Sequence, residues 1–196
     1  MSYVIEFKAV DLLLNSDLPT KTVDAFSLSL IKAERQIRRI FTYTVFQSPS
    51  FGEEHIKDLR STLSQSRFVY FEGLVNGFNQ LSEQSLEQIV GGSYEVLRSQ
   101  MALATKHRNK IFHGQLTNSS LGAEQLLVEI NNIKSWCSEV AEASKNHIGY
   151  CGFARNSFKK SDVPLNGKLK HHIPSIAAYS EFISNHMENI HFQAQR

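Results

Sequence analysis

The stretch "RNKIFHG", residues 108–114, places an arginine, an amide and a histidine where a helix is expected to end. The guanidinium of Arg108 is a phosphate ligand with fixed donor geometry, and the imidazole of His113 titrates near neutrality. Asn109 and His113 share one helical face, whereas Arg108 lies roughly 140° around the helix from His113. The long side chain of Arg108, or a second copy of the helix, must close that gap. These groups suit metal-independent phosphodiester cleavage, because an imidazole takes the proton from a ribose 2′-hydroxyl while cations stabilise charge on the phosphate oxygens.

Arg108, Asn109 and His113 resemble the motif of the HEPN superfamily (higher eukaryotes and prokaryotes nucleotide-binding), in which an arginine precedes a polar residue and then a histidine. The resemblance extends to Gly114 and covers about residues 20–147. It is to the stand-alone bacterial HEPN ribonucleases, and it implies a metal-independent endoribonuclease without a cofactor. By that resemblance His113 is the base, Arg108 stabilises charge and Asn109 orients the site. It also implies RNA as substrate, a homodimer with two facing motifs, a toxin or antiviral defence role, and an antitoxin or regulatory protein as a further partner.

Two other interpretations of this stretch remain open. Cations near a helix C-terminus are favourable by about 0.3–1 kcal/mol each, which explains a cluster of Lys, Arg and His without any catalysis. The same bundle could also be a non-catalytic module that binds a nucleotide, an RNA or a partner protein. His107 is interpreted as a bystander that packs against the helix surface.

The candidate RNA-binding residues are lysines beside the motif or in a basic segment near the C-terminus: Lys106, Lys110, Lys159, Lys160, Lys168 and Lys170. Within the basic segment, residues 155–172, Phe158 could stack on a base. An exposed loop without RNA contacts is an equal alternative for this segment. A second basic strip in the first long helix is better explained as a solvated face, because Glu34 can pair with Arg38 one turn later.

Composition indicates one soluble globular domain, residues 1–196. The chain has 41% hydrophobic and 20% charged residues and a formal charge of +2, so binding of nucleic acid must depend on local clusters. Its beginning lacks the pattern of a secretory signal, and no apolar run is long enough to span a bilayer. A cytoplasmic protein without membrane contact is expected.

The sequence does not favour a metal site. The histidine pairs His171/His172 and His186/His191 lack the i,i+4 spacing of a helical zinc site, and the acidic residues are scattered. The two cysteines are too few for a disulfide framework. No metal is therefore expected at the candidate site.

Helical periodicity dominates the chain and predicts an all-α fold, a HEPN-like bundle of about five helices with a C-terminal helical extension. The expected elements are helices at 22–46, 51–81, 86–90, 94–113, about 121–146 and about 174–191, with a loop at 150–173. Capping spacings place Ser50, Ser85 and Ser120 before three of these helices, and Gly114 at the end of another. The opening "YVIEFKAV" alternates weakly and could form a short strand.

Overall fold

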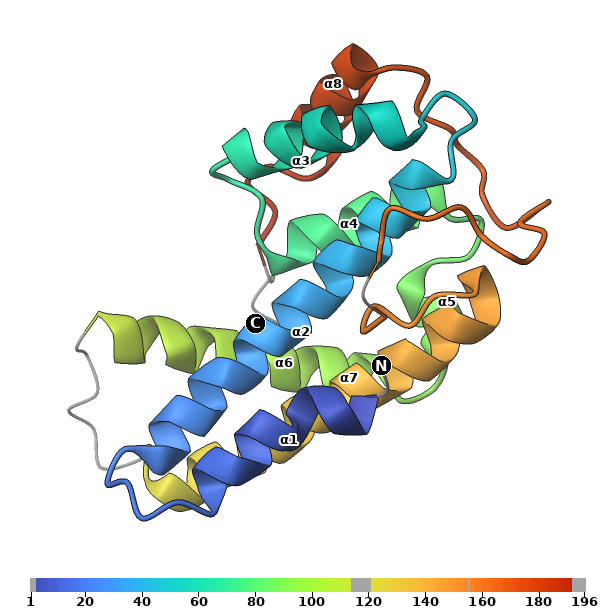
Figure 1. The fold of residues 1–196 in the computed structure, drawn as a ribbon. Helices are drawn as coiled ribbons and strands as arrows, with labels where there is room; N and C mark the ends of the chain where they lie inside the picture. The colour runs from blue at the N-terminus through green and yellow to red at the C-terminus, as the bar shows by residue number, and fades with distance from the viewer. Residues whose placement is uncertain (1–2, 114–120, 155, 192–196) are drawn as a thin grey trace.

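All the regular secondary-structure elements in the described part of the chain are helices. The structure is a computed structural model that describes residues 3–113, 121–154 and 156–191. Within these ranges one short 3-10 helix, η1 (Glu53–His55), accompanies the α-helices (Figure 1): α1 (Tyr3–Leu14), α2 (Lys21–Phe46), α3 (Ile56–Gln65), α4 (Phe71–Leu81), α5 (Leu86–Val90), α6 (Tyr94–Phe112), α7 (Ala123–Ile148) and α8 (Ile176–His186). The prediction of an all-α bundle is confirmed, although these eight α-helices exceed the five and an extension that were expected.

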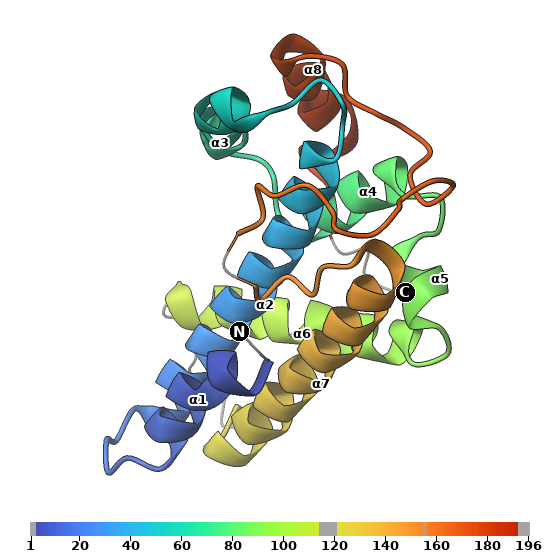
Figure 2. The ribbon, with the colours of Figure 1, turned by 45° about the vertical axis from the view of Figure 1, so that its right-hand side comes forward.

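The long helix α2 is the centre of the bundle. Its N-terminal half packs against α1 and α7, and its C-terminal half packs against α4 (Figure 2). Phe26, Ile37 and Phe41 recur at helical spacing along it and are fully buried. α6 crosses α2 and packs along α7, which brings the C-terminal turns of α6 close to the N-terminal half of α2.

The expected strand at the start of the chain is wrong, because these residues form α1. Tyr3, Phe7 and Val10 lie on one helical face, with Phe7 and Val10 buried against the core and the Tyr3 hydroxyl donating to the Lys134 carbonyl at 2.9 Å. The weak alternation came from apolar residues such as Val4, which are exposed on the other side of the helix. Burial of one helical face therefore decides the conformation of this segment.

The single helix predicted over 51–81 is also wrong, because the chain breaks after α3. Ser66 is extended, and Val69 forms an isolated antiparallel bridge with Glu188, which follows α8. The break lets α3 pack against α8 while α4 packs against α2, so two short helices bury more than one straight helix could. The predicted cap at Ser50 is wrong as well, since the first helical turn starts after Gly52.

Other sequence predictions are confirmed. The Ser85 cap is present, because its hydroxyl accepts from the Gln88 N–H at 3.2 Å and its own N–H donates to the Gln88 side chain at 2.8 Å. α6 and α7 occupy nearly the ranges expected. α7 begins after Gly122, whereas the predicted terminal residues Ser120 and Gly114 lie outside the described residues.

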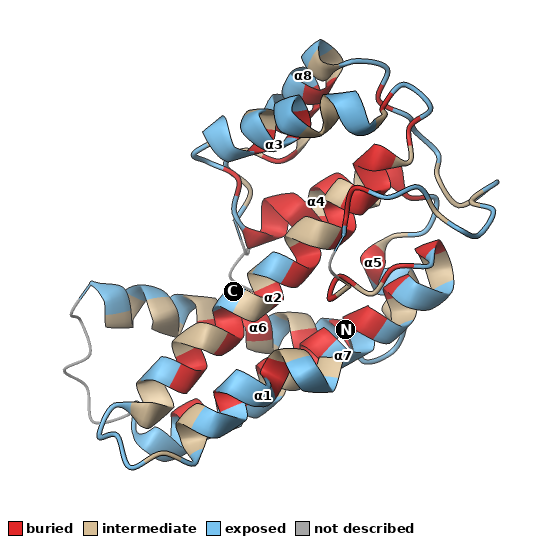
Figure 3. Cartoon of the chain, viewed as in Figure 1, coloured by how far each residue is buried: buried red, intermediate tan, exposed pale blue. Residues whose placement is uncertain are grey.

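α8 packs against α4, whose residues are mostly buried (Figure 3), and α3 packs against α8. Tyr179, Ile183 and Met187 are buried against the core, but the helix ends at His186, earlier than predicted. Gly73 of α4 lies directly against the end of α8, where a Cβ atom would be only 2.1 Å from the Met187 carbonyl oxygen. This close approach fixes where the chain emerges from α8.

The described residues between 150 and 173 form the expected irregular segment, which is anchored to α2. The Lys160 ammonium donates to the Phe46 and Ser48 carbonyls at 2.6 and 2.7 Å. Farther along α2, the buried amide of Gln36 donates to the carbonyls of Cys137 and Cys151. No helix among the described residues is long and apolar enough to span a membrane.

Candidate functional site

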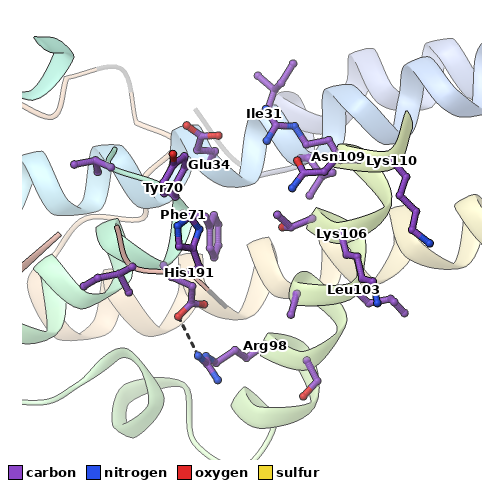
Figure 4. Close-up of a pocket in the computed structure, with 18 residues that line it drawn as sticks. Ile31, Glu34, Tyr70, Phe71, Arg98, Leu103, Lys106, Asn109, Lys110 and His191 are labelled. Atoms are coloured by element: carbon purple, nitrogen blue, oxygen red, sulfur yellow. Dashed lines mark hydrogen bonds and ion pairs between the residues drawn. The ribbon is translucent and has the colours of Figure 1, made fainter. Parts of the chain in front are cut away.

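The C-terminal turns of α6 form one wall of a cleft with a volume of about 1000 Å³ (Figure 4). Lys106, Arg108, Asn109 and Lys110 line this wall, so two of the three predicted catalytic residues and two of the predicted RNA-binding lysines lie together. α6 is held here by Met101 and Ala104, which are buried against the core one and two turns earlier. The cationic side chains therefore project from a rigid element.

The opposite side of the cleft is built by two other segments. α2 contributes Leu30, Ile31 and Glu34, and the end of the α3–α4 connection together with the start of α4 contributes the residues from Val69 to Glu72. The Glu34 carboxylate pairs with Arg38 on the next turn at 3.3 Å, as the sequence predicted, so part of its charge is balanced. The cleft thus has a cationic wall from α6 and a less charged wall facing it.

Aromatic rings stand on the side of the cleft opposite α6 (Figure 4), and they were not predicted from the sequence. The rings of Tyr70 and His191 lie with centroids 4.6 Å apart and planes inclined by 31°, and Tyr70 keeps 41% of its surface exposed. His191 is brought to Tyr70 by the bridge between Val69 and Glu188, which ties the chain after α8 to the start of α4. Residues far apart in sequence thereby form one surface of the cleft.

An ion pair between α6 and α4 also lines the cleft. The Arg98 guanidinium donates to Glu72 Oε2 at 3.0 Å, shown as a dashed line in Figure 4, while Glu72 Oε1 has no hydrogen-bond partner within the described ranges. Burial raises the pKa of the Glu72 carboxyl, and the hydrogen bond and charge of Arg98 oppose that rise. Because Glu72 offsets Arg98, the net positive charge of the cleft comes mainly from α6.

His113 lies apart from this cleft. It is the C-terminal capping residue of α6, its N–H donates to the Asn109 carbonyl at 3.1 Å, and its side chain is exposed and does not line the cleft. The Arg108 guanidinium lies over the Phe112 ring at 5.4 Å, a cation–π contact. One chain thus brings Arg108 and Asn109 together at the cleft and leaves His113 at the helix end.

His107 is not a bystander. Its Nδ1 lies 2.5 Å from Oε1 of Glu129, a carboxylate that is 1% exposed on α7, and Gln125 donates to the same oxygen at 3.3 Å. The signal was present in the sequence, because Glu129 sits on the apolar stripe of α7 next to Ile130. This pair fastens α6 to α7 at the residue immediately before Arg108.

The four predicted RNA-binding lysines of the basic segment lie outside this cleft. Lys159 pairs with Asp162, and Lys160 borders a separate cavity of about 550 Å³. Lys168 and Lys170 exchange backbone hydrogen bonds with the end of α4. Phe158, the suggested stacking residue, is 9% exposed and packs edge-on against Phe46 with ring centroids 5.6 Å apart, so its ring is not presented to a base.

Comparisons with protein-family models, with curated proteins and with solved structures give no match for this chain. The candidate site therefore has to be judged from the side chains that line it and from the elements that hold them.

The described residues do not present a set of metal ligands. No group of three or more His, Cys, Asp or Glu side chains within these ranges is placed to hold an ion. Cys137 is buried in the core, where burial raises the pKa of its thiol, and Cys151 is half-buried, and both are free thiols. The chemistry that the cleft offers through its described side chains is that of cations, amides and aromatic rings.

Proposed function

We propose that this protein is a metal-independent endoribonuclease of the HEPN type. In the proposed reaction His113 takes the proton from a ribose 2′-hydroxyl, whose oxygen attacks the adjacent phosphorus. The bond from phosphorus to the 5′ oxygen breaks, and that oxygen takes a proton from an imidazolium. The products carry a 2′,3′-cyclic phosphate and a 5′-hydroxyl. Arg108 stabilises the charge on the phosphate oxygens and Asn109 orients the reacting groups.

The observation that carries the proposal is the shared cleft of Arg108, Asn109, Lys106 and Lys110. A preference of cations for a helix C-terminus explains positive charge on the last turn of α6. It does not explain an asparagine and an arginine lining one concave surface opposite a second wall. A cleft of this kind suits a polyanion, since a guanidinium binds phosphate oxygens through two donors at once.

The working unit in this proposal is a homodimer. His113 lies outside the cleft of its own chain, and a two-fold axis beside the end of α6 would bring it and the partner subunit's His113 to one phosphate. Exposed apolar side chains suited to such an interface are present near the motif: Ile31 and Leu103 line the cleft and are 57% and 44% exposed, and Phe112 at the end of α6 is 63% exposed. One imidazole would then act as base and the other as acid.

A toxin or antiviral defence role follows from the resemblance of the motif, with an antitoxin or another regulatory protein as a further partner. Such a role requires a nuclease whose activity is restrained until it is needed. Lysines in the segment 150–173, including Lys159 and Lys168, would serve a longer RNA that continues beyond the cleft.

The placement of His113 favours one alternative function. A cleft that holds Arg108 and Asn109 without the histidine could bind a nucleotide, an RNA or a partner protein and cut nothing. Catalysis and binding alone differ in whether His113 is needed.

The test is RNA cleavage in the presence of EDTA. Wild-type protein should cut an RNA pool and leave 2′,3′-cyclic phosphate ends, whereas His113→Ala and Arg108→Ala should be inactive with unchanged melting temperatures. His171→Ala is the matched control, because His171 is also exposed and lies in the basic segment, and it should keep full activity. Cleavage that requires added magnesium, or that survives in His113→Ala, would contradict the proposal.

A further inference from the structure

The two walls of the cleft differ in chemistry. The α6 wall carries Lys106, Arg108 and Lys110, whereas Tyr70 and His191 stand at the other side. Nucleic acid has the same division, with phosphates along the backbone and flat bases projecting from it. A groove that combines cationic side chains with aromatic rings is the arrangement with which proteins hold single-stranded nucleic acid.

We infer that the Tyr70–His191 ring pair is a stacking platform for an unpaired base of a single-stranded nucleic acid whose phosphates lie along the α6 wall. This inference deepens the proposed function, because it identifies single-stranded RNA as the substrate class of the same cleft. Tyr70 is held in place because it is the N-cap residue of α4. The His191 ring lies against the Tyr70 ring, with centroids 4.6 Å apart, and is itself exposed, so a base would stack on the outer face of this pair.

The size of the cleft favours a strand over a single nucleotide. Its volume of about 1000 Å³ is at the upper end of the roughly 300–1,000 Å³ typical of small-molecule sites. Base pairs in a duplex are already stacked and their faces are covered, so a platform of this kind selects unpaired bases. Stacking does not read the 2′-hydroxyl, so single-stranded DNA should occupy the same site without being cut.

Single-stranded DNA is therefore the probe, because its binding can be measured on the wild-type protein without cleavage. Fluorescence anisotropy with a labelled deoxyoligonucleotide should show that Tyr70→Ala weakens binding by about 5- to 150-fold, the equivalent of about 1–3 kcal/mol for one stacked base. Tyr70→Phe should bind like wild type, because the ring is kept. Phe68→Ala is the matched control, since Phe68 is an exposed aromatic residue two positions away, 51% exposed against 41% for Tyr70, that does not line the cleft.

Two further probes, a duplex and a mononucleotide, are compared with the single-stranded oligonucleotide. A duplex of the same sequence should bind more weakly than the single strand, and a mononucleotide should compete poorly. Equal affinity of wild type and a folded Tyr70→Ala, or equal effects of Tyr70→Ala and Phe68→Ala, would overturn the inference, as would a mononucleotide that binds as tightly as the oligonucleotide. RNA cleavage in EDTA is scored separately. A nuclease whose affinity for single-stranded DNA ignores Tyr70 refutes the platform alone, and Tyr70-dependent binding without cleavage refutes only the nuclease.

Discussion

Removing His107 should destabilise the protein more than removing any surface histidine, because it leaves a buried carboxylate without its partner. Glu129 is 1% exposed, and its Oε2 already has no hydrogen-bond partner among the described residues. Leaving a buried acceptor without its hydrogen-bond partner costs about 1–3 kcal/mol, and more when the acceptor is charged. Since Glu129 is a carboxylate but 15% of the His107 side chain remains exposed, we expect a cost of about 3 kcal/mol for His107→Ala.

For a chain of this length each kcal/mol lowers the melting temperature by roughly 2–4 °C, so His107→Ala should melt about 6–12 °C below wild type. His55→Ala is the matched control. His55 also faces a carboxylate, Glu54 at 3.2 Å, and its Nδ1 accepts from the Gly52 N–H, but Glu54 is 72% exposed, so the pair should contribute less than about 1 kcal/mol.

A double-mutant cycle identifies the cause. In His107→Ala/Glu129→Gln the uncompensated charge is gone, so the double variant should be more stable than the sum of the single changes predicts, with a coupling of roughly 0.5–3 kcal/mol. Urea unfolding at neutral pH measures all four proteins. If His107→Ala is as stable as His55→Ala, or if the two changes simply add, the buried pair does not stabilise the junction of α6 and α7.

The remaining predictions concern the other end of the bundle. Burial, with a smaller contribution from the charge of Lys168, lowers the pKa of His147 in the folded protein, so the unfolded chain binds more protons between that lowered pKa and about 6.5. Stability should therefore fall as pH is lowered through this window, and thermal melts of His147→Gln should show a flatter pH dependence there; an unchanged slope would contradict it. Phe158→Ala should cost about 3–5 kcal/mol, because the ring packs against Phe46 and lies 4.9 Å from the Arg60 guanidinium. A folded Phe158→Ala protein that loses nucleic-acid binding instead of stability would restore the stacking role first expected of it.

The long periodic helices could be predicted from the sequence because their burial follows a local pattern. α2, α6 and α7 each repeat apolar residues at steps of three and four, and Ser85 with Gln88 marks a cap within four residues. The break at Ser66 could not be predicted in this way. It depends on the pairing of Val69 with Glu188, more than a hundred residues away, and no local spacing reports such a contact.

The same limit applies to the candidate site: residues within a local pattern could be predicted, and residues brought together by long-range contacts could not. Arg108 and Asn109 were found from the sequence because the motif is contiguous and lies on one helix. Tyr70 and His191 were missed, since each is an ordinary aromatic residue until the fold places them 4.6 Å apart. Glu129 is the intermediate case, because an acidic residue on an apolar helical stripe indicates a buried partner but does not identify that partner.

One residue that lines the cleft, His191, is synthesised well after the residues of the α6 wall. His191 follows Asn109 by about 80 residues, which corresponds to roughly 4–16 s of translation at common elongation rates. During that interval the α6 wall has been synthesised, but the ring that lies against Tyr70 has not. If the protein is a ribonuclease, a growing chain therefore lacks part of its binding site for single-stranded RNA while its own messenger RNA is still being translated. The order of synthesis would then protect that messenger until the chain has been extended to His191.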